Sequence, residues 1–276
     1  MSERFNMDAE ELLAKYAEGQ RQFHQEKLSG VDLKGKDLSG IDLYYADLSE
    51  ANLSGANLNK AKLYSTNLSK ACLTNANLNE AQMDSANLNL AELNGADLSK
   101  ASLCSANLDN AKLDNVNLSN SRLDSAKLNG TSLSEADLSR ASLRNANLTG
   151  ANLVGADLNR ANLSDAILPN ANLEEANFQL ANLSKVNMSG ANLTNAYLVG
   201  AELQEVNLKK ACLQGASLET ANLKGANLIK ANLHKANLKK ADLTDASTYG
   251  ANTKNANFNG AIMPDGERFQ VENSKK

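Results

Sequence analysis

The sequence predicts an all-β quadrilateral β-helix, a coil with four sides in which each side is five residues long. From Val31 to Asp265 the chain runs through 47 consecutive five-residue units, here called pentads, without an insertion or deletion. Position three of the pentad is Leu in 40 of them, and position one is Ala in 38. Position two is mostly Asn or Asp, and positions four and five are mixed polar. A repeat this regular has to be explained before any other feature of the chain.

A period of five matches neither the 3.6 residues of a helical turn nor the 2.0 of a long strand. The chain must therefore turn a corner in every pentad if all the Leu side chains are to lie inside. Four pentads per coil would give about twelve coils, with backbone hydrogen bonds between coils about 4.8 Å apart. The small Ala at position one leaves room for so narrow a coil to close.

The residues at position five support four sides. A type II turn needs Gly or Asn where φ is positive, and position five is expected to carry that residue. In every fourth pentad, starting from Gly35, position five is Gly or Asn in nine of twelve cases, whereas in the column starting from Tyr45 it is so in two. This contrast appears only when the pentads are sorted by fours.

Tandem units of the form Ala-(Asp/Asn)-Leu-x-x resemble those of the pentapeptide-repeat proteins. The resemblance implies a right-handed quadrilateral β-helix, and it adds the hand of the coil, which periodicity does not give. Residues 11–23 and 261–266 are also similar to the terminal segments of cyanobacterial members. The resemblance to those members implies a regulatory role.

Residues 8–19 are predicted to form a short helix that covers the first coil. Apolar residues recur at helical spacing at Ala9, Leu12, Leu13 and Tyr16. Asn6 or Asp8 can cap the start of this helix and Gly19 its end. An uncovered β-helix end exposes unpaired strands around an apolar opening, so a covering helix protects it. The alternative is an amphipathic helix that binds a membrane or a partner, which its acidic polar face disfavours.

We expect one domain with three segments. The capping helix and lead-in take residues 1–25, the β-helix residues 26–265, and a polar tail residues 266–276. Phe23 and Leu28 already occupy position three, so the first coil should begin just before them.

The carboxy-terminal end departs from the repeat. Thr248 and Thr253 replace Leu at position three, and Phe258 and Met263 are then expected to fill the opening of the coil. The turn sequence at 264–266 should direct the chain away, and we expect the polar residues that follow to be frayed.

The sequence offers no recognisable catalytic or metal centre, so we expect no enzyme, no cofactor and no small-molecule substrate. The only His residues are His24 and His234, and no Cys/His group has metal spacing. Phosphate loops and nucleophile motifs are absent. Carboxylates at position two fall one on each side of the coil, which favours turn capping over an acid/base pair. A tube filled with Leu should also leave no cavity for a substrate.

The chain has no signal-peptide pattern and no run of 18 apolar residues, so we expect a cytoplasmic protein without membrane contact. Cys72, Cys104 and Cys212 should lie too far apart to pair, and free thiols are typical of a reducing compartment.

Function should then lie on the outer surface, where three groups of residues stand out. The first is aromatic: Tyr44 and Tyr64 are 20 residues apart and should stack on one side, with Tyr45 beside them. Exposed Tyr residues are favoured contact anchors, but Tyr also covers sheet faces that bind nothing.

The second group is apolar. Leu180, Tyr197 and Val199 fall on one side in adjoining coils and should point outward. Phe178 and Met188 enlarge the core beneath them, so a local bulge with an apolar patch is expected.

The third group is basic and consists of Lys209, Lys210, Lys230, Lys235, Lys239 and Lys240. Residues 31–205 hold 13 basic and 20 acidic side chains, whereas residues 206–260 hold 8 basic and 3 acidic ones. A basic patch fits an acidic partner, although Lys on a solenoid also serves solvation and edge protection.

The sequence favours a non-catalytic scaffold that binds an unidentified protein partner through its outer faces. The alternative is a DNA-mimicking modulator of a type II topoisomerase such as DNA gyrase, which is known for another branch of pentapeptide-repeat proteins. Twelve coils would span about 57 Å, over which B-DNA carries about 34 charges, whereas the net charge of the chain is −4. Those members are dimers joined through a carboxy-terminal module. No such module is recognised here, so we expect a monomer that does not bind nucleic acid directly.

Overall fold

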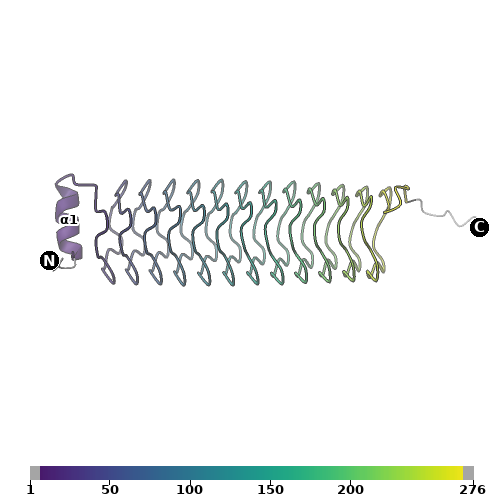
Figure 1. The fold of residues 1–276 in the computed structure, drawn as a ribbon, viewed down its shortest axis with the longest axis horizontal. Helices are drawn as coiled ribbons and strands as arrows, with labels where there is room; N and C mark the ends of the chain where they lie inside the picture. Colours follow the sequence, from purple (N-terminus) through teal and green to yellow (C-terminus); the bar gives the residue numbers. More distant parts are fainter. Residues whose placement is uncertain (1–6, 270–276) are drawn as a thin grey trace, which may run out of the picture. The chain divides into compact units, whose positions relative to one another are not determined.

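The computed structural model describes residues 7–269, which form two compact units. Unit 1 runs to Ser142 and unit 2 begins at Leu143. Each unit consists of stacked coils (Figure 1). Among the described residues the only helix is α1, Ala9–Ala17, and the β-structure consists of single-residue bridges rather than longer strands.

The bridges establish four pentads per coil, as predicted. Within each unit, position-two residues pair in parallel with the residue 20 positions further along the chain. In unit 1 the pairs run from Gln22 with Asp42 to Arg122 with Ser142, and in unit 2 from Asn147 with Ile167 to Asp242 with Ile262. The predicted lead-in therefore already contains a bridged residue.

The pentad around Leu53 shows how the backbone amides are used. Leu53 and Gly55 donate to carbonyls of the next coil at 2.7 and 2.9 Å, and Asn52 donates to the previous coil at 2.9 Å. The Ala56 amide closes the turn onto the Leu53 carbonyl at 3.0 Å. The Ser54 amide donates to the side-chain oxygen of Asn52 at 3.2 Å. The Ala51 amide bonds to the Leu48 carbonyl at 3.1 Å, so every amide of this pentad has an acceptor, as a buried backbone requires.

Asp and Asn at position two cap the corners, which confirms the predicted role of these carboxylates. Asp37 and Asp47 each accept the amide of the residue two positions later at 3.1 Å. Where position two is Ser102, the carboxylate at position four of the previous coil takes over this role. Asp84 accepts the Cys104 amide at 2.8 Å.

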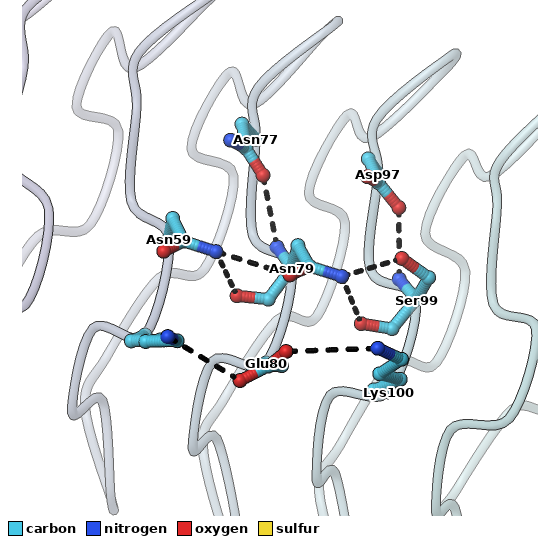
Figure 2. A network of polar contacts seen from close by, with 8 residues as sticks. Asn59, Asn77, Asn79, Glu80, Asp97, Ser99 and Lys100 are labelled. Carbon is cyan, nitrogen blue, oxygen red and sulfur yellow. Dashed lines mark hydrogen bonds and ion pairs between the residues drawn. The ribbon is translucent and has the colours of Figure 1, made fainter.

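Side chains also join neighbouring coils on the outside, as one side of unit 1 shows (Figure 2). Asn59 donates to the carbonyl of Asn79 at 3.0 Å, and Asn79 donates to the residue 20 positions further on at the same distance. Glu80 lies between Lys60 and Lys100, at 3.8 and 3.7 Å. The amide ladder supports the stacking, while ion pairs as exposed as these contribute little.

Position five has a left-handed backbone in every pentad from Gln25 to Gly260, which the sequence predicted only for Gly and Asn. Tyr45 has φ 56° and Leu180 φ 57°, close to the 64° of Gly35. The conformation costs an L-residue about 1–2 kcal/mol. The turn hydrogen bond and the backbone hydrogen bonds to the previous and the next coil impose this conformation on all four sides. The column rich in Gly and Asn therefore does not mark a separate kind of corner.

The interior is filled by positions one and three. In unit 1 every position-three side chain from Phe23 to Leu138 is at most 1% exposed. Polar residues at position one remain satisfied, because the buried Thr66 hydroxyl donates to the Leu43 carbonyl at 2.8 Å.

The ends of α1 are capped as the sequence predicts. The Asp8 carboxylate accepts the Glu11 amide at 2.8 Å, and Gly19 follows the last turn with φ 98°. The Gly19 and Gln20 amides return to carbonyls of the last turn at 3.0 Å, a Schellman arrangement. Asn6, the other predicted cap, lies outside the described residues.

The helix covers the amino-terminal end of unit 1 (Figure 1). Leu12 is fully buried, and the Tyr16 hydroxyl donates to the Ser39 carbonyl at 2.8 Å. The Arg21 guanidinium lies 3.9 Å from the centre of the Tyr16 ring. Because Phe23 in the first coil is also buried, the predicted covering role of this helix is confirmed.

The carboxy-terminal end of unit 2 contradicts the prediction that the opening is filled. Phe258 and Met263 are only half-buried, and Thr253 is exposed. A cavity of about 490 Å³ remains there, so the expectation of no cavity was wrong. The two Thr residues at position three are too small to occupy the volume that Leu fills elsewhere.

The chain beyond the last pentad also differs from the prediction. Residues 267–269 are not frayed, because Arg268 pairs in antiparallel with Ile262 and the Phe269 amide donates to a carbonyl of the last pentad at 2.8 Å. Gly266, with φ 83°, reverses the chain. The Phe269 and Phe258 rings then pack at 5.8 Å. The rest of the predicted tail, residues 270–276, lies outside the described part.

The variant Leu93→Asp tests the architecture. It places a carboxylate where the Leu side chain is 0% exposed, so we expect it to lower the free energy of unfolding by about 4 kcal/mol or more. Asn115→Asp adds the same charge at an exposed corner and should change it by less than about 0.5 kcal/mol. The measurement is equilibrium denaturation in urea, and equal stability of the two variants would contradict the inward position of Leu93.

The acid sensitivity of the corners can be tested at Asp47. Burial acts to raise the pKa of this carboxyl, but hydrogen bonds from Ser49 and Asn67 and the charge of Lys27 outweigh it, so the pKa lies below its ordinary value. A carboxyl whose pKa is lowered by folding stabilises the protein at pH values above its ordinary pKa of about 4. That contribution is lost as the pH falls through the pKa of the folded state. Below about pH 4 the free energy of unfolding should therefore fall less steeply for Asp47→Asn than for the parent. Parallel curves in that range would contradict the assignment.

Candidate functional site

The three predicted Tyr residues form one cluster in unit 1. The Tyr44 ring meets Tyr45 edge-on with centroids 4.3 Å apart and meets Tyr64 at 6.2 Å. His24 adds a fourth ring, 5.9 Å from Tyr44. Tyr44 is 39% exposed and Tyr45 53% exposed. These four residues are called the aromatic cluster below.

Polar contacts fix the base of the aromatic cluster. The Tyr64 hydroxyl donates to the Gln82 side-chain oxygen at 2.6 Å, and His24 Nε2 lies 3.0 Å from Asp42. The neighbouring Tyr45 hydroxyl raises the pKa of Tyr44. Burial and then the charge of a nearby carboxylate raise the pKa of Tyr64. A raised pKa keeps both phenols neutral, and the single O–H of Tyr64 is already donated to Gln82.

The predicted apolar patch in unit 2 is also assembled. Leu180 is 54% exposed and Tyr197 48% exposed, while Val199 is half-buried. The Leu180 side chain leans over Gly200, with Cδ2 2.9 Å from the point that a Cβ there would occupy. Phe178 is fully buried beneath the patch. The ladder bonds of this pentad keep ordinary lengths, 2.7 and 3.1 Å, so the larger core side chain does not break the coil.

The predicted Lys residues do not form one surface. The register of 20 residues places Lys209, Lys210 and Lys230 on one side of unit 2, Lys235 on the next, and Lys239 and Lys240 on a third. Lys239 pairs with Glu219 at 3.2 Å. Lys209 and Lys210 line a shallow groove of about 260 Å³ with Asn170, Ser189 and Gly190.

The family model described as Pentapeptide repeats matches eight copies in the chain, over residues 27–59, 41–80, 81–120, 121–160, 156–195, 187–225 and 213–245. These ranges cover more than half of the sequence. The chain belongs to the pentapeptide-repeat family. The fold of this family is known as a right-handed quadrilateral β-helix, and its members are generally structural or scaffold proteins.

The chain is also similar to several solved pentapeptide-repeat structures. HetL, involved in heterocyst differentiation regulation in the cyanobacterium Nostoc sp. strain PCC 7120, is 35% identical, with 96% of this chain and 100% of HetL covered and a TM-score of 0.39. A second Nostoc PCC 7120 member is 42% identical over 36% of this chain and 80% of its own, with a TM-score of 0.35. QnrB1, a plasmid-mediated fluoroquinolone resistance protein, is 17% identical over 72% of this chain and 85% of its own, with a TM-score of 0.30. No curated protein matches.

This pentapeptide-repeat protein also exposes apolar residues that the sequence analysis missed. Leu90, Ile167 and Tyr249 are 48%, 41% and 79% exposed. Each stands at an outward pentad position, so the rule that identified Leu180 would have found them. Within residues 7–269 no helix is long and apolar enough to cross a membrane.

The corner at Tyr45 offers a test of what its side chain contributes to folding. Tyr45→Gly relieves the left-handed backbone but loses ring contacts, so we expect the free energy of unfolding to stay within about 1 kcal/mol of the parent. Tyr45→Val should lose at least about 1 kcal/mol more, because a β-branched residue tolerates positive φ poorly. Urea denaturation measures both variants, and a Val variant at least as stable as the Gly variant would contradict the corner conformation.

Proposed function

We propose that this pentapeptide-repeat protein is a non-catalytic, regulatory scaffold that binds a protein partner through outward side chains, with the aromatic cluster as its main contact. The observation that supports this most is the exposure of two contacting Tyr rings on a fixed base. Tyr side chains are enriched among the residues that dominate binding energy at interfaces. They also lose little conformational entropy when they are already held by neighbours.

Tyr45 occupies a corner that glycine fits without steric cost. The equivalent corner positions in two preceding pentads are Gly35 and Gly40, which adopt the same φ without steric cost. An aromatic side chain at such a corner is strained and gains only edge contacts in return. Non-Gly residues throughout position five share this conformation, so the exposure of the Tyr45 ring, rather than its backbone strain, supports the proposal.

The apolar patch around Leu180 is the second proposed contact surface, because it joins two largely exposed apolar side chains in adjoining coils. The Lys residues of unit 2 are a third, with electrostatic contacts that salt would weaken. The proposed location is the cytoplasm, supported by Cys72, Cys104 and Cys212, which are free thiols. The proposed state is a monomer.

The alternative function, a DNA-mimicking modulator of DNA gyrase, has less support. A mimic needs dense negative charge, whereas the chain carries 28 basic and 32 acidic side chains. On the side of unit 1 shown in Figure 2, Glu80 is flanked by two Lys residues. Such alternation does not reproduce a row of phosphates.

The test starts from affinity capture with the parent protein from the native cytosol. Tyr44→Ala with Tyr45→Gly, and separately Leu180→Ser with Tyr197→Ser, should each keep the melting temperature within about 5 °C of the parent, because no inward atom is removed. The Tyr pair should weaken binding of the captured partner by at least about thirtyfold.

Asn115→Asp is the matched surface control and should bind like the parent. If both double variants bind the partner as tightly as the parent, neither the aromatic cluster nor the apolar patch is the contact surface. The Lys residues of unit 2 would then be the proposed contact, and rising salt should weaken binding. Inhibition of gyrase supercoiling by the purified protein at about micromolar concentration would instead favour the DNA mimic.

A further inference from the structure

The last coil of unit 2 is open, whereas the first coil of unit 1 is covered by α1. The chain folds back over only one of the four sides of that coil, where Arg268 pairs with Ile262. The other three sides, residues 246–260, have nothing stacked on them in the described part of the chain. Each of them therefore ends in an unpaired edge.

The unpaired edge presents backbone donors. In the rest of the unit, amides at positions three and five donate to carbonyls of the next coil, as Leu233 and Lys235 do at 2.7 and 3.0 Å. On the three open sides the corresponding amides belong to Thr248, Gly250, Thr253, Asn255, Phe258 and Gly260, and among the described residues none has a hydrogen-bond acceptor. An extended segment laid along one side would offer carbonyls of alternate residues at the matching spacing.

The charge around this edge is one-sided. The three open sides of the last two coils, residues 226–240 and 246–260, contain no Asp or Glu. They hold five Lys residues, Lys230, Lys235, Lys239, Lys240 and Lys254, of which Lys239 pairs with Glu219 of the preceding coil. The carboxylates of these two coils, Asp242, Asp245 and Asp265, all belong to the side that the chain itself covers.

Two of these Lys residues reach toward the open edge. Cγ of Lys230 lies 3.4 Å, and Cγ of Lys240 3.6 Å, from the points that Cβ atoms would occupy at Gly250 and Gly260. The two Gly residues are corners of the last coil and carry unpaired amides. Positive charge and backbone donors therefore coincide at two corners, which favours an anionic ligand that also carries carbonyl acceptors.

The third feature is the cavity of about 490 Å³ inside this edge, lined by Leu233, Leu243, Phe258 and Met263 and also by Thr248 and Thr253. Its volume lies in the range of ligand pockets and exceeds that of one large apolar side chain. A nucleic acid would satisfy the Lys residues but has no aliphatic side chain for this cavity. A peptide can make all three kinds of contact. Its carbonyls can accept hydrogen bonds from the amides, its carboxylates can pair with the Lys residues, and an apolar side chain can fill the cavity.

We propose that the open carboxy-terminal edge of unit 2 binds an extended acidic segment of a protein partner by strand addition. The segment follows the edge from Gly250 around the next corner to Gly260. Its carbonyls accept the unpaired amides, its carboxylates lie near Lys230 and Lys240, and one Leu or Phe side chain enters the cavity. This site is separate from the aromatic cluster and the apolar patch but includes Lys230 and Lys240 of the third proposed contact surface, and a defined peptide tests it without the captured partner.

In the test, the full chain is titrated into a fluorescein-labelled peptide in which Glu alternates with Leu and Phe, and binding is followed by fluorescence anisotropy. We expect saturable binding that is weakened at least about tenfold by Lys230→Glu with Lys240→Glu. The control variant, Arg160→Glu with Lys185→Glu, makes the same charge change elsewhere in unit 2. Its affinity for the peptide should stay within about twofold of that of the parent. Peptides with Lys in place of Glu, or Ser in place of Leu and Phe, should not bind. Thr253→Leu partly fills the cavity and should weaken binding while cooperative thermal unfolding is kept.

Hydrogen exchange supplies a second readout, because the bound peptide should slow exchange of the amides of residues 246–260. Absence of saturable binding, or equal weakening by the two double variants, would overturn the proposal. Binding of an oligothymidylate in place of the peptide would assign the edge to nucleic acid. Binding only after removal of residues 270–276 would mean that the chain's own tail occupies the edge. Binding only at dilutions at which the protein is monomeric would mean that a second copy occupies it. Either result would overturn the proposal.

Discussion

The structure depends on one constraint, which is that the backbone turns a left-handed corner at every fifth residue. The corner directs positions one and three inward and brings each residue beside the one 20 positions further on. Only then can the amides of positions two, three and five bond to neighbouring coils. Leu53 and its neighbours show all of these bonds in one pentad. Backbone hydrogen bonds between coils form on both sides of each corner. They offset the steric cost of residues such as Tyr45 and Leu180 at positive φ.

The same constraint separates folding from function. Interior positions accept almost only Leu and Ala, since the coil is too narrow for larger pairs, and a polar residue such as Thr66 survives there only by donating to a carbonyl. Outward positions have little effect on the coil. Their side chains can therefore vary without loss of the fold, which is why interaction surfaces such as the aromatic cluster can form in a regular scaffold.

Much of this could be predicted from the sequence, because a repeat without insertions fixes which residues share a side. The inward Leu residues, the register of 20 and the capping helix followed from spacing and from Asp8 and Gly19. His24 stands in the same column as Tyr44 and Tyr64 and could have been found by that rule. The conformation of non-Gly corners could not, because the ladders impose it against local preference. Nor could the return of the chain at Gly266, which depends on packing of Phe269 on Phe258.

The most direct test of the central claim is native-state amide hydrogen exchange resolved by residue. The ladders protect amides at positions two, three and five, the turn bond protects position one, and only a side chain at position two or four protects position four. We therefore predict a protection pattern with a period of five in both units, with its minimum at position four. Uniform protection, or a pattern without this period, would contradict the corner-and-ladder architecture.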